Sequence, residues 1–112
     1  MISAKDIYWL AGIIEGKGYF GIGRTRYPYI QVRTTDLDII ERVNVFFKAS
    51  ICKEDRSIRK TSYVVRSSHK TSVPLIMTIY TLLGQRRRTR AKYVLALWRN
   101  WKSNLRPGTN AY

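Results

Sequence analysis

The chain has 112 residues, with 21 lysines and arginines against 7 aspartates and glutamates, and a formal net charge of +14. This length suits one compact domain with a modest hydrophobic core and leaves no room for two domains. Glycine and basic residues break every apolar run before it could span a membrane, and the first six residues lack signal-peptide features. We therefore expect a cytoplasmic protein with no membrane partner. Cys52 is the only cysteine, which excludes an internal disulfide and a cysteine-based zinc site.

The positive charge is the strongest feature of the composition. So much like charge on a small domain repels itself when the chain is compact, and a polyanionic partner relieves that repulsion. Nucleic acid is the commonest such partner, so the composition favours a nucleic-acid-binding protein over a merely soluble basic one. An anionic membrane is a weaker alternative, because the expected helices need their apolar faces for a core.

In the first half of the chain, the patterns predict a helix, two strands and a second helix. Ser3 followed by Asp6 predicts a capping box, and the helix it opens should end between Gly16 and Gly18. Alternation predicts strands over residues 19–26 and 29–34, joined by a turn at Tyr27 and Pro28. The sequence from residue 35 to residue 38 repeats the capping-box signal and predicts a helix over the following residues.

The second half repeats that order. A weaker strand is expected over residues 51–56 and a better one over residues 62–67. Ser72, with Pro74 in the first turn, predicts the start of a third helix that Gly84 caps. After residues 85–88 a last helix should run through residues 91–101. We expect one domain over residues 1–102 and a loose tail over residues 103–112.

The expected order α-β-β-α-β-β-α-α places helices and paired strands in separate segments. That order predicts an α+β protein, with an antiparallel sheet covered by helices on one face. Because Ile30 and Val32 must face the core, Gln31 and Arg33 should lie on the other face, together with Val64 and Arg66. The uncovered face of the sheet should therefore be polar and basic.

The segment from Leu10 to Gly18, LAGIIEGKG, resembles the LAGLIDADG motif of homing endonucleases and group I intron maturases. The order of a helix followed by two paired strands, which occurs twice along the chain, also fits that family. The resemblance covers roughly residues 3–102. It implies the family's αββαββα fold and cleavage of double-stranded DNA with Mg²⁺. It also implies residence in the DNA-containing compartment of the host. An ordinary amphipathic helix would not explain Gly12 inside the helix, which costs about 1 kcal/mol against alanine.

The motif departs from the family at its eighth position. The resemblance places an essential metal-binding acid there, and this chain has Lys17. An ammonium group cannot bind Mg²⁺, so we expect cleavage to be impaired; Glu15, at the sixth position, is only a weak substitute ligand. The resemblance also places a phosphate-stabilising basic residue near the last helix, which alignment assigns to Arg87, with a plain solvated charge run as the equal alternative.

The resemblance further implies a homodimer, because the chain carries one copy of the motif and the motif helices of two copies pair. Small residues allow that close approach, and the expected interface residues are Leu10, Ala11, Gly12 and Ile14. The sheet would enter the major groove, where glutamine pairs well with adenine and arginine with guanine. The candidate DNA-binding residues are Arg24, Arg26, Gln31, Arg33, Thr34, Arg66, Lys70, Arg86 and Arg88, with Arg59 and Lys60 as further phosphate contacts.

Two functions remain open at this stage. The first is a homodimeric homing endonuclease, impaired by Lys17, whether that lysine is natural or introduced. The second is a non-cleaving nucleic-acid binder on the same scaffold, either an intron RNA maturase or a DNA-binding regulator. A preference for structured RNA over duplex DNA would separate them. An unrelated basic structural protein is a third, more remote reading, and it predicts a monomer.

Overall fold

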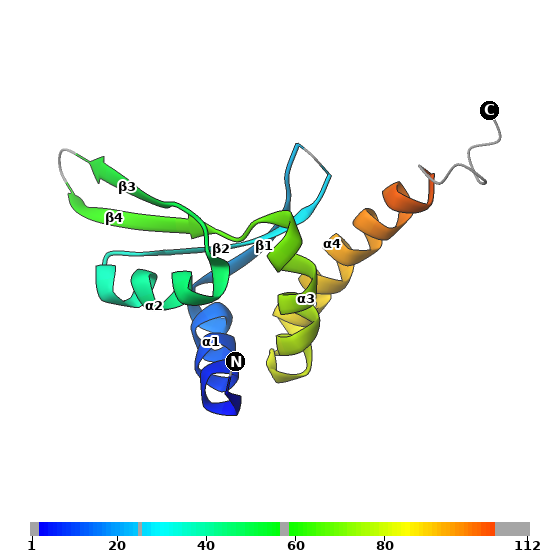
Figure 1. The fold of residues 1–112 in the computed structure, drawn as a ribbon, viewed down its shortest axis with the longest axis horizontal. Coiled ribbons are helices and arrows are strands. Elements are labelled where there is room, and N and C mark those ends of the chain that lie inside the picture. The colour runs from blue at the N-terminus through cyan, green and yellow to red at the C-terminus, as the bar shows by residue number, and fades with distance from the viewer. Residues whose placement is uncertain (1–2, 25, 57–58, 105–112) are drawn as a thin grey trace.

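The structure of the protein is a computed structural model that describes residues 3–24, 26–56 and 59–104. The described residues form helices and antiparallel strands, which confirms the expected α+β class (Figure 1). In chain order the elements are α1 (Ala4–Lys17), β1 (Gly18–Ile22), β2 (Pro28–Thr34), α2 (Leu37–Phe47), β3 (Ile51–Arg56), β4 (Arg59–Arg66), α3 (His69–Ile79), the short 3₁₀ helix η1 (Tyr80–Leu82) and α4 (Gln85–Asn104). None of the described helices is long and apolar enough to cross a membrane.

The strands form one antiparallel sheet in the order β1-β2-β4-β3. Figure 1 shows α1, α2 and α3 on one side of this sheet, while the other side carries no helix. The α4 helix packs along β1 and contributes Ala91 and Val94 to the same core. The predicted arrangement, with helices covering one face, is therefore confirmed.

The alternation in β2 divides the two faces of the sheet as predicted. Ile30 and Val32 are fully buried against the helices, whereas Arg33 is exposed and Gln31 is half-buried on the open side. Gln31 pairs with Arg66 on β4, and Arg33 pairs with Val64. Because side chains alternate between faces, the polar residues of these central strands come together on one surface.

Both ends of α1 follow the sequence signals. The Ser3 hydroxyl accepts the Asp6 backbone N–H, and the Asp6 carboxylate accepts the Ser3 N–H, so the predicted capping box is present. The helix ends at Lys17, and the chain enters β1 directly at Gly18. A Cβ at Gly18 would lie 2.7 Å from the Ile14 carbonyl oxygen, so only glycine allows the strand to leave the helix this closely.

One predicted strand end and one predicted helix cap are corrected by the structure. The first strand ends at Ile22 and not at residue 26, because a tight turn follows in which Gly23 bonds to Tyr27 and Arg26 adopts a φ of 65°. The second helix is capped at Asp36 without a side-chain hydrogen bond, so the predicted capping box beginning at Thr35 is absent.

The third helix starts earlier than its proline suggested. Ser68, and not Ser72, is the N-cap, and Pro74 lies inside the helix. Both Thr71 and Ser72 donate their backbone N–H to the Ser68 carbonyl, at 3.0 and 2.9 Å, and the buried Ser72 hydroxyl donates to the same oxygen. Ser72 therefore bonds back along a helix that has already begun, as serines within helices often do.

The last helix also starts earlier than predicted, at Gln85, so the arginine run lies within its first turn. Gly84 does not end α3, because that helix passes into η1 at Tyr80. Gly84 instead precedes α4, where its carbonyl accepts the Arg88 N–H at 2.9 Å. Ser103, expected in the tail, is helical, and residues 105–112 of the expected tail lie outside the described residues.

Candidate nucleic-acid interface

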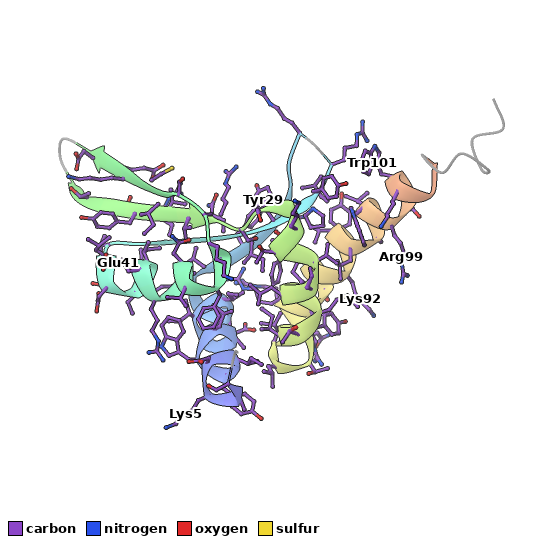
Figure 2. All side chains as sticks on the ribbon, viewed as in Figure 1. Lys5, Tyr29, Glu41, Lys92, Arg99 and Trp101 are labelled. Atoms are coloured by element: carbon purple, nitrogen blue, oxygen red, sulfur yellow. The ribbon has the colours of Figure 1, made fainter. Side chains whose placement is uncertain are left out.

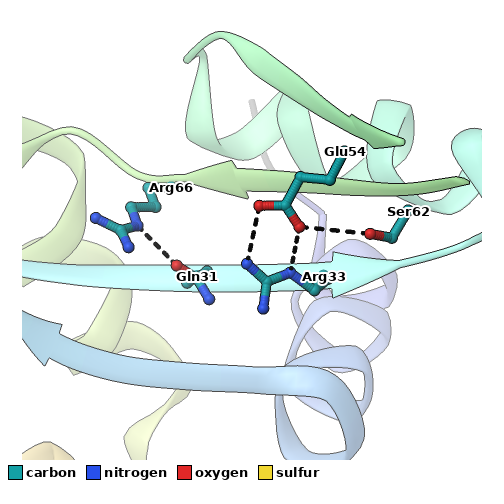
Figure 3. A network of polar contacts seen from close by, with 5 residues as sticks. All are labelled: Gln31, Arg33, Glu54, Ser62 and Arg66. Carbon is teal, nitrogen blue, oxygen red and sulfur yellow. Dashed lines mark hydrogen bonds and ion pairs between the residues drawn. The ribbon is translucent and has the colours of Figure 1, made fainter. Parts of the chain in front are cut away.

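The open face of the sheet is the first candidate surface, because no helix covers it (Figure 1). Its centre carries Gln31 and Arg66, which are paired across β2 and β4. The Arg66 Nε donates to Gln31 Oε1 at 2.7 Å, and its guanidinium carbon lies 4.5 Å from the centre of the Tyr29 ring (Figure 3). Arg66 is therefore held in place by an amide and an aromatic ring, both uncharged.

A second pair lies beside the first and is charged on both sides. Arg33 on β2 meets Glu54 on β3 through two contacts, Nε to Oε1 at 3.1 Å and Nη2 to Oε2 at 3.3 Å (Figure 3). Glu54 also accepts a hydrogen bond from the Ser62 hydroxyl at 3.4 Å. The positive charge of Arg33 is thus balanced on the protein, although both side chains remain partly exposed.

Sequence reasoning missed Arg90, which ties α4 to the edge strand β1. Its Nε donates to the Phe20 carbonyl at 2.8 Å and its Nη2 donates to the Tyr19 hydroxyl at 2.8 Å. The guanidinium also lies against the ring of Tyr93, 5.1 Å from its centre. Arg90 stands four residues before the buried Val94, and that helical spacing was the signal that could have placed it toward the sheet.

The end of α1 meets the start of α4, and this junction brings together the predicted catalytic residues. The Glu15 carboxylate accepts the Gly84 backbone N–H at 2.6 Å, while the Glu15 carbonyl accepts the Nε of Arg87 at 3.1 Å. Lys17, the last residue of α1, is exposed beside this junction. The structure thus places Arg87 beside the motif, and its expected role toward a phosphate stays a prediction.

The residues at this junction do not fit a divalent-metal site. Glu15 is the one carboxylate there, and one of its oxygens is already engaged by Gly84. Across the described ranges, no three histidine, cysteine, aspartate or glutamate side chains gather as a metal would require. The exposed ammonium of Lys17 repels a cation and attracts a phosphate. Mg²⁺ binding in an active form, with Glu15 as a weak ligand, therefore stays a prediction, and Lys17 opposes it in this chain.

Three of the four expected interface residues are corrected by their burial. Leu10, Ala11 and Ile14 belong to the core of the chain itself, with relative exposures of 1%, 3% and 0%. Their side chains are therefore covered without a partner. Gly12 is exposed on the opposite side of α1, in line with Gly16, and a Cβ at either glycine would meet nothing within 4 Å.

Thr34 is the one DNA-binding candidate that the structure removes from the surface. It is 6% exposed, and its hydroxyl accepts the Asp36 N–H at 3.3 Å at the start of α2. The hairpin arginines Arg24 and Arg26 are exposed, in a loop that rises on the open side of the sheet (Figure 1). They border a groove of about 290 Å³ that also includes Trp101.

The remaining basic candidates lie on two helix starts. Lys70 is exposed in the first turn of α3, and Arg86 and Arg88 are exposed in the first turn of α4. Arg86 lines an open groove of about 720 Å³ with Arg90 and Tyr93, next to the edge strand β1. Arg59 and Lys60 belong to β4, but their side chains lie outside the described part of the structure.

No protein-family model matches the sequence, and no curated protein matches it either. Solved structures do resemble the fold. One is the group I intron-encoded homing endonuclease I-CeuI complexed with DNA, with a TM-score of 0.69 and 13% sequence identity over 93% of this chain and 58% of that chain. Another is the homing endonuclease I-TnaI, with a TM-score of 0.59 and 14% identity over 93% of this chain and 80% of that chain. This chain therefore spans little more than half the length of I-CeuI, and its fold is that of the LAGLIDADG homing endonucleases.

Proposed function

We propose that the protein binds a specific site in double-stranded DNA as a homodimer, and that its cleavage of that DNA is impaired. The observation that carries the proposal is the open face of the sheet, where Gln31 and Arg66 stand uncovered (Figure 3). A sheet ribbon fits the major groove, and side chains on one face then meet the base edges. The formal charge of +14 supplies the sequence-independent attraction to phosphates. In I-CeuI the related fold is seen complexed with DNA.

The exposed side of α1 supports the proposed homodimer. Gly12 and Gly16 are one turn apart on this side, and neither has a neighbour within 4 Å of a built Cβ. Tyr8, one turn earlier, is 63% exposed. Two such helices can approach closely where side chains are absent. Close packing in a dimer would then offset the free energy that each glycine costs the helix. A second copy would place its own sheet beside the first and double the length of DNA covered.

In the family that the motif resembles, cleavage depends on a metal-binding acid at the end of the motif helix, and Lys17 stands at that position here. Two copies of this lysine would meet at the twofold axis of the dimer, beside the phosphates that are to be cut. Their charge favours phosphate binding and disfavours the divalent ion that activates water in metal-dependent hydrolysis. Arg87, tied to the Glu15 carbonyl, lies close enough to the same junction to help hold a phosphate.

Lys17 also supports the alternative of a non-cleaving binder on the same scaffold, an intron RNA maturase or a DNA-binding regulator. A binder that does not cut DNA needs no metal site, so the lysine would be no loss to it. Paired A-form RNA has a deep and narrow major groove that a sheet cannot enter, so the open face favours duplex DNA.

The decisive experiment uses the full chain and its Lys17→Glu variant in parallel. A preferred duplex site is first selected from a random DNA library, and each protein is then incubated with that site in Mg²⁺. We expect both proteins to bind the site, and we expect paired strand breaks with the variant alone. Strong Mg²⁺-dependent cutting by the unaltered chain would contradict impairment. Folded, dimeric proteins that select no duplex and bind structured RNA would support the maturase.

A further inference from the structure

The two arginines on the open face differ in what holds them. Glu54 holds Arg33 through two of its nitrogens and balances its charge. Arg66 is held by Gln31 and Tyr29, and among the described residues no carboxylate lies within ion-pair distance of it. No carboxylate among the described residues therefore balances the positive charge of Arg66, at the centre of the surface that is proposed to meet DNA.

The contact with Arg66 fixes the orientation of the Gln31 amide. A guanidinium carries only donors, so the Gln31 atom at 2.7 Å from Arg66 Nε must be the carbonyl oxygen. The amide nitrogen is turned away from Arg66 (Figure 3). The hydrogens left for a ligand lie on Gln31 Nε2 and on the two terminal nitrogens of Arg66, beside the one lone pair of Gln31 Oε1 that Arg66 does not use.

We propose that Gln31 and Arg66 act as one base-reading unit that prefers guanine to adenine. This inference rests on the proposed function and names a specificity within it. A free glutamine matches adenine because it offers one donor and one acceptor, as adenine N7 and N6 require. In the unit, Arg66 uses one lone pair of the Gln31 acceptor and adds its own donors and positive charge beside it. Guanine presents two acceptors, N7 and O6, to the major groove and so matches a set of donors with a positive charge.

The same reasoning makes Arg33 a weaker guanine contact than Arg66. Recognition of guanine by an arginine uses two parallel N–H donors and a free positive charge. Glu54 occupies two donors of Arg33 and carries the opposite charge. We therefore assign the guanine preference to Gln31 and Arg66, and we expect Arg33 to gain one when Glu54 is neutralised.

The test is selection of preferred sites from a random duplex library, followed by binding measurements on single-base variants of the selected site. The proteins are the unaltered chain, Gln31→Ala, Arg66→Ala and the double variant, each checked for folding by circular dichroism. We expect guanine at one position of each half-site, preferred about tenfold or more over adenine. Each single variant should lose the preference at that same position, and the double variant should lose no more than the worse single one.

Glu54→Gln is the matched control, because it changes the neighbouring pair and leaves the unit intact. It should keep the guanine at the shared position and add a guanine preference at a different one, where the released Arg33 reaches. A preference for adenine at the shared position would overturn the base-reading unit and leave the proposed function standing. Single variants that lose base preference at two different positions would do the same. Failure of the folded, unaltered chain to bind any duplex would overturn the proposed function and the unit with it.

Discussion

The Glu15 carboxylate accepts the Gly84 backbone N–H at 2.6 Å, and so joins the last turn of α1 to the residue before α4. The backbone N–H groups at a helix start lack partners within the helix, and a negative charge there interacts favourably with the helix dipole. Arg87, in the first turn of α4, donates in return to the Glu15 carbonyl. The motif helix and the last helix are therefore locked together at the place where the motif carries its acids.

Glu15→Ala should lower the free energy of unfolding by about 1–2 kcal/mol, which is the usual loss when a helix cap is removed. Glu15→Gln keeps an acceptor but loses the charge, so its loss should be about half as large. Urea denaturation followed by circular dichroism measures both changes. Glu41→Ala, at an exposed site on α2, is the control and should change stability by less than about 0.5 kcal/mol (Figure 2). Equal losses at Glu15 and Glu41 would contradict the helix junction.

Substitutions at Gly12 should affect the stability of the single chain and the formation of the proposed dimer differently. Gly12→Ala has room in the chain and should stabilise α1 by up to about 1 kcal/mol in denaturation experiments at concentrations where the chain is monomeric. Gly12→Leu also has room within the chain, but its side chain would hold two α1 helices apart. Sedimentation velocity should therefore show monomers for this variant at concentrations where the unaltered chain is dimeric.

Val45→Leu is the control for Gly12→Leu, because Val45 is 67% exposed on a different helix, α2. It should leave the association unchanged. A Gly12→Leu protein that sediments as the unaltered chain does would show that this face of α1 is not the dimer contact.

Arg90→Met should loosen β1 from α4 and leave the rest of the fold in place. The substitution keeps an apolar stem but removes the donors to the Phe20 carbonyl and to the Tyr19 hydroxyl. Because β1 is an edge strand, its outer carbonyls depend on such contacts, and the loss should be about 1–3 kcal/mol. Relative to the unaltered chain, the variant should show a larger increase in amide hydrogen exchange in β1 than in β4. Arg99→Met, exposed on the same helix, is the control and should leave β1 unchanged (Figure 2).

The sequence was most informative where a signal is local. The Ser3 capping box and the alternation of β2 depend on residues a few positions apart, and both appear in the structure as predicted. The start of α3 was misplaced because Pro74 is typical of a first turn, although a helix that begins earlier can also hold it. Gly84 was misassigned as the cap of α3, because a 3₁₀ turn follows that helix. Gly84 instead precedes α4 and donates its backbone N–H to Glu15.

The functional surface was harder to predict because its contacts join distant parts of the chain. Gln31 and Arg66 are 35 positions apart, and Arg90 is 70 positions from the strand carbonyl that it binds. Periodicity showed that Leu10 and Ile14 share a stripe of α1, but this helix has apolar or small residues on both sides. A pattern of that kind does not tell which side faces the chain's own core, and three of the four residues expected at the dimer interface lie in that core.

Lys17 gives a last prediction, on the salt dependence of DNA binding. Each phosphate that a protein cation neutralises adds about 0.9 to the slope of log affinity against log salt concentration, because condensed counterions are released. A homodimer has two copies of Lys17, so Lys17→Gln should reduce that slope by about 2 if both lysines contact phosphate. Titrations of one selected duplex at several salt concentrations measure the change.

Lys5→Gln is the matched control, because Lys5 is exposed near the start of α1, at the end of that helix away from the sheet (Figure 2). It removes the same charge and should leave the slope almost unchanged. A smaller slope for Lys17→Gln alone would place this lysine on the DNA backbone, where it substitutes a direct phosphate contact for a metal-mediated one. Equal slopes for the two variants would mean that Lys17 does not contact the DNA backbone.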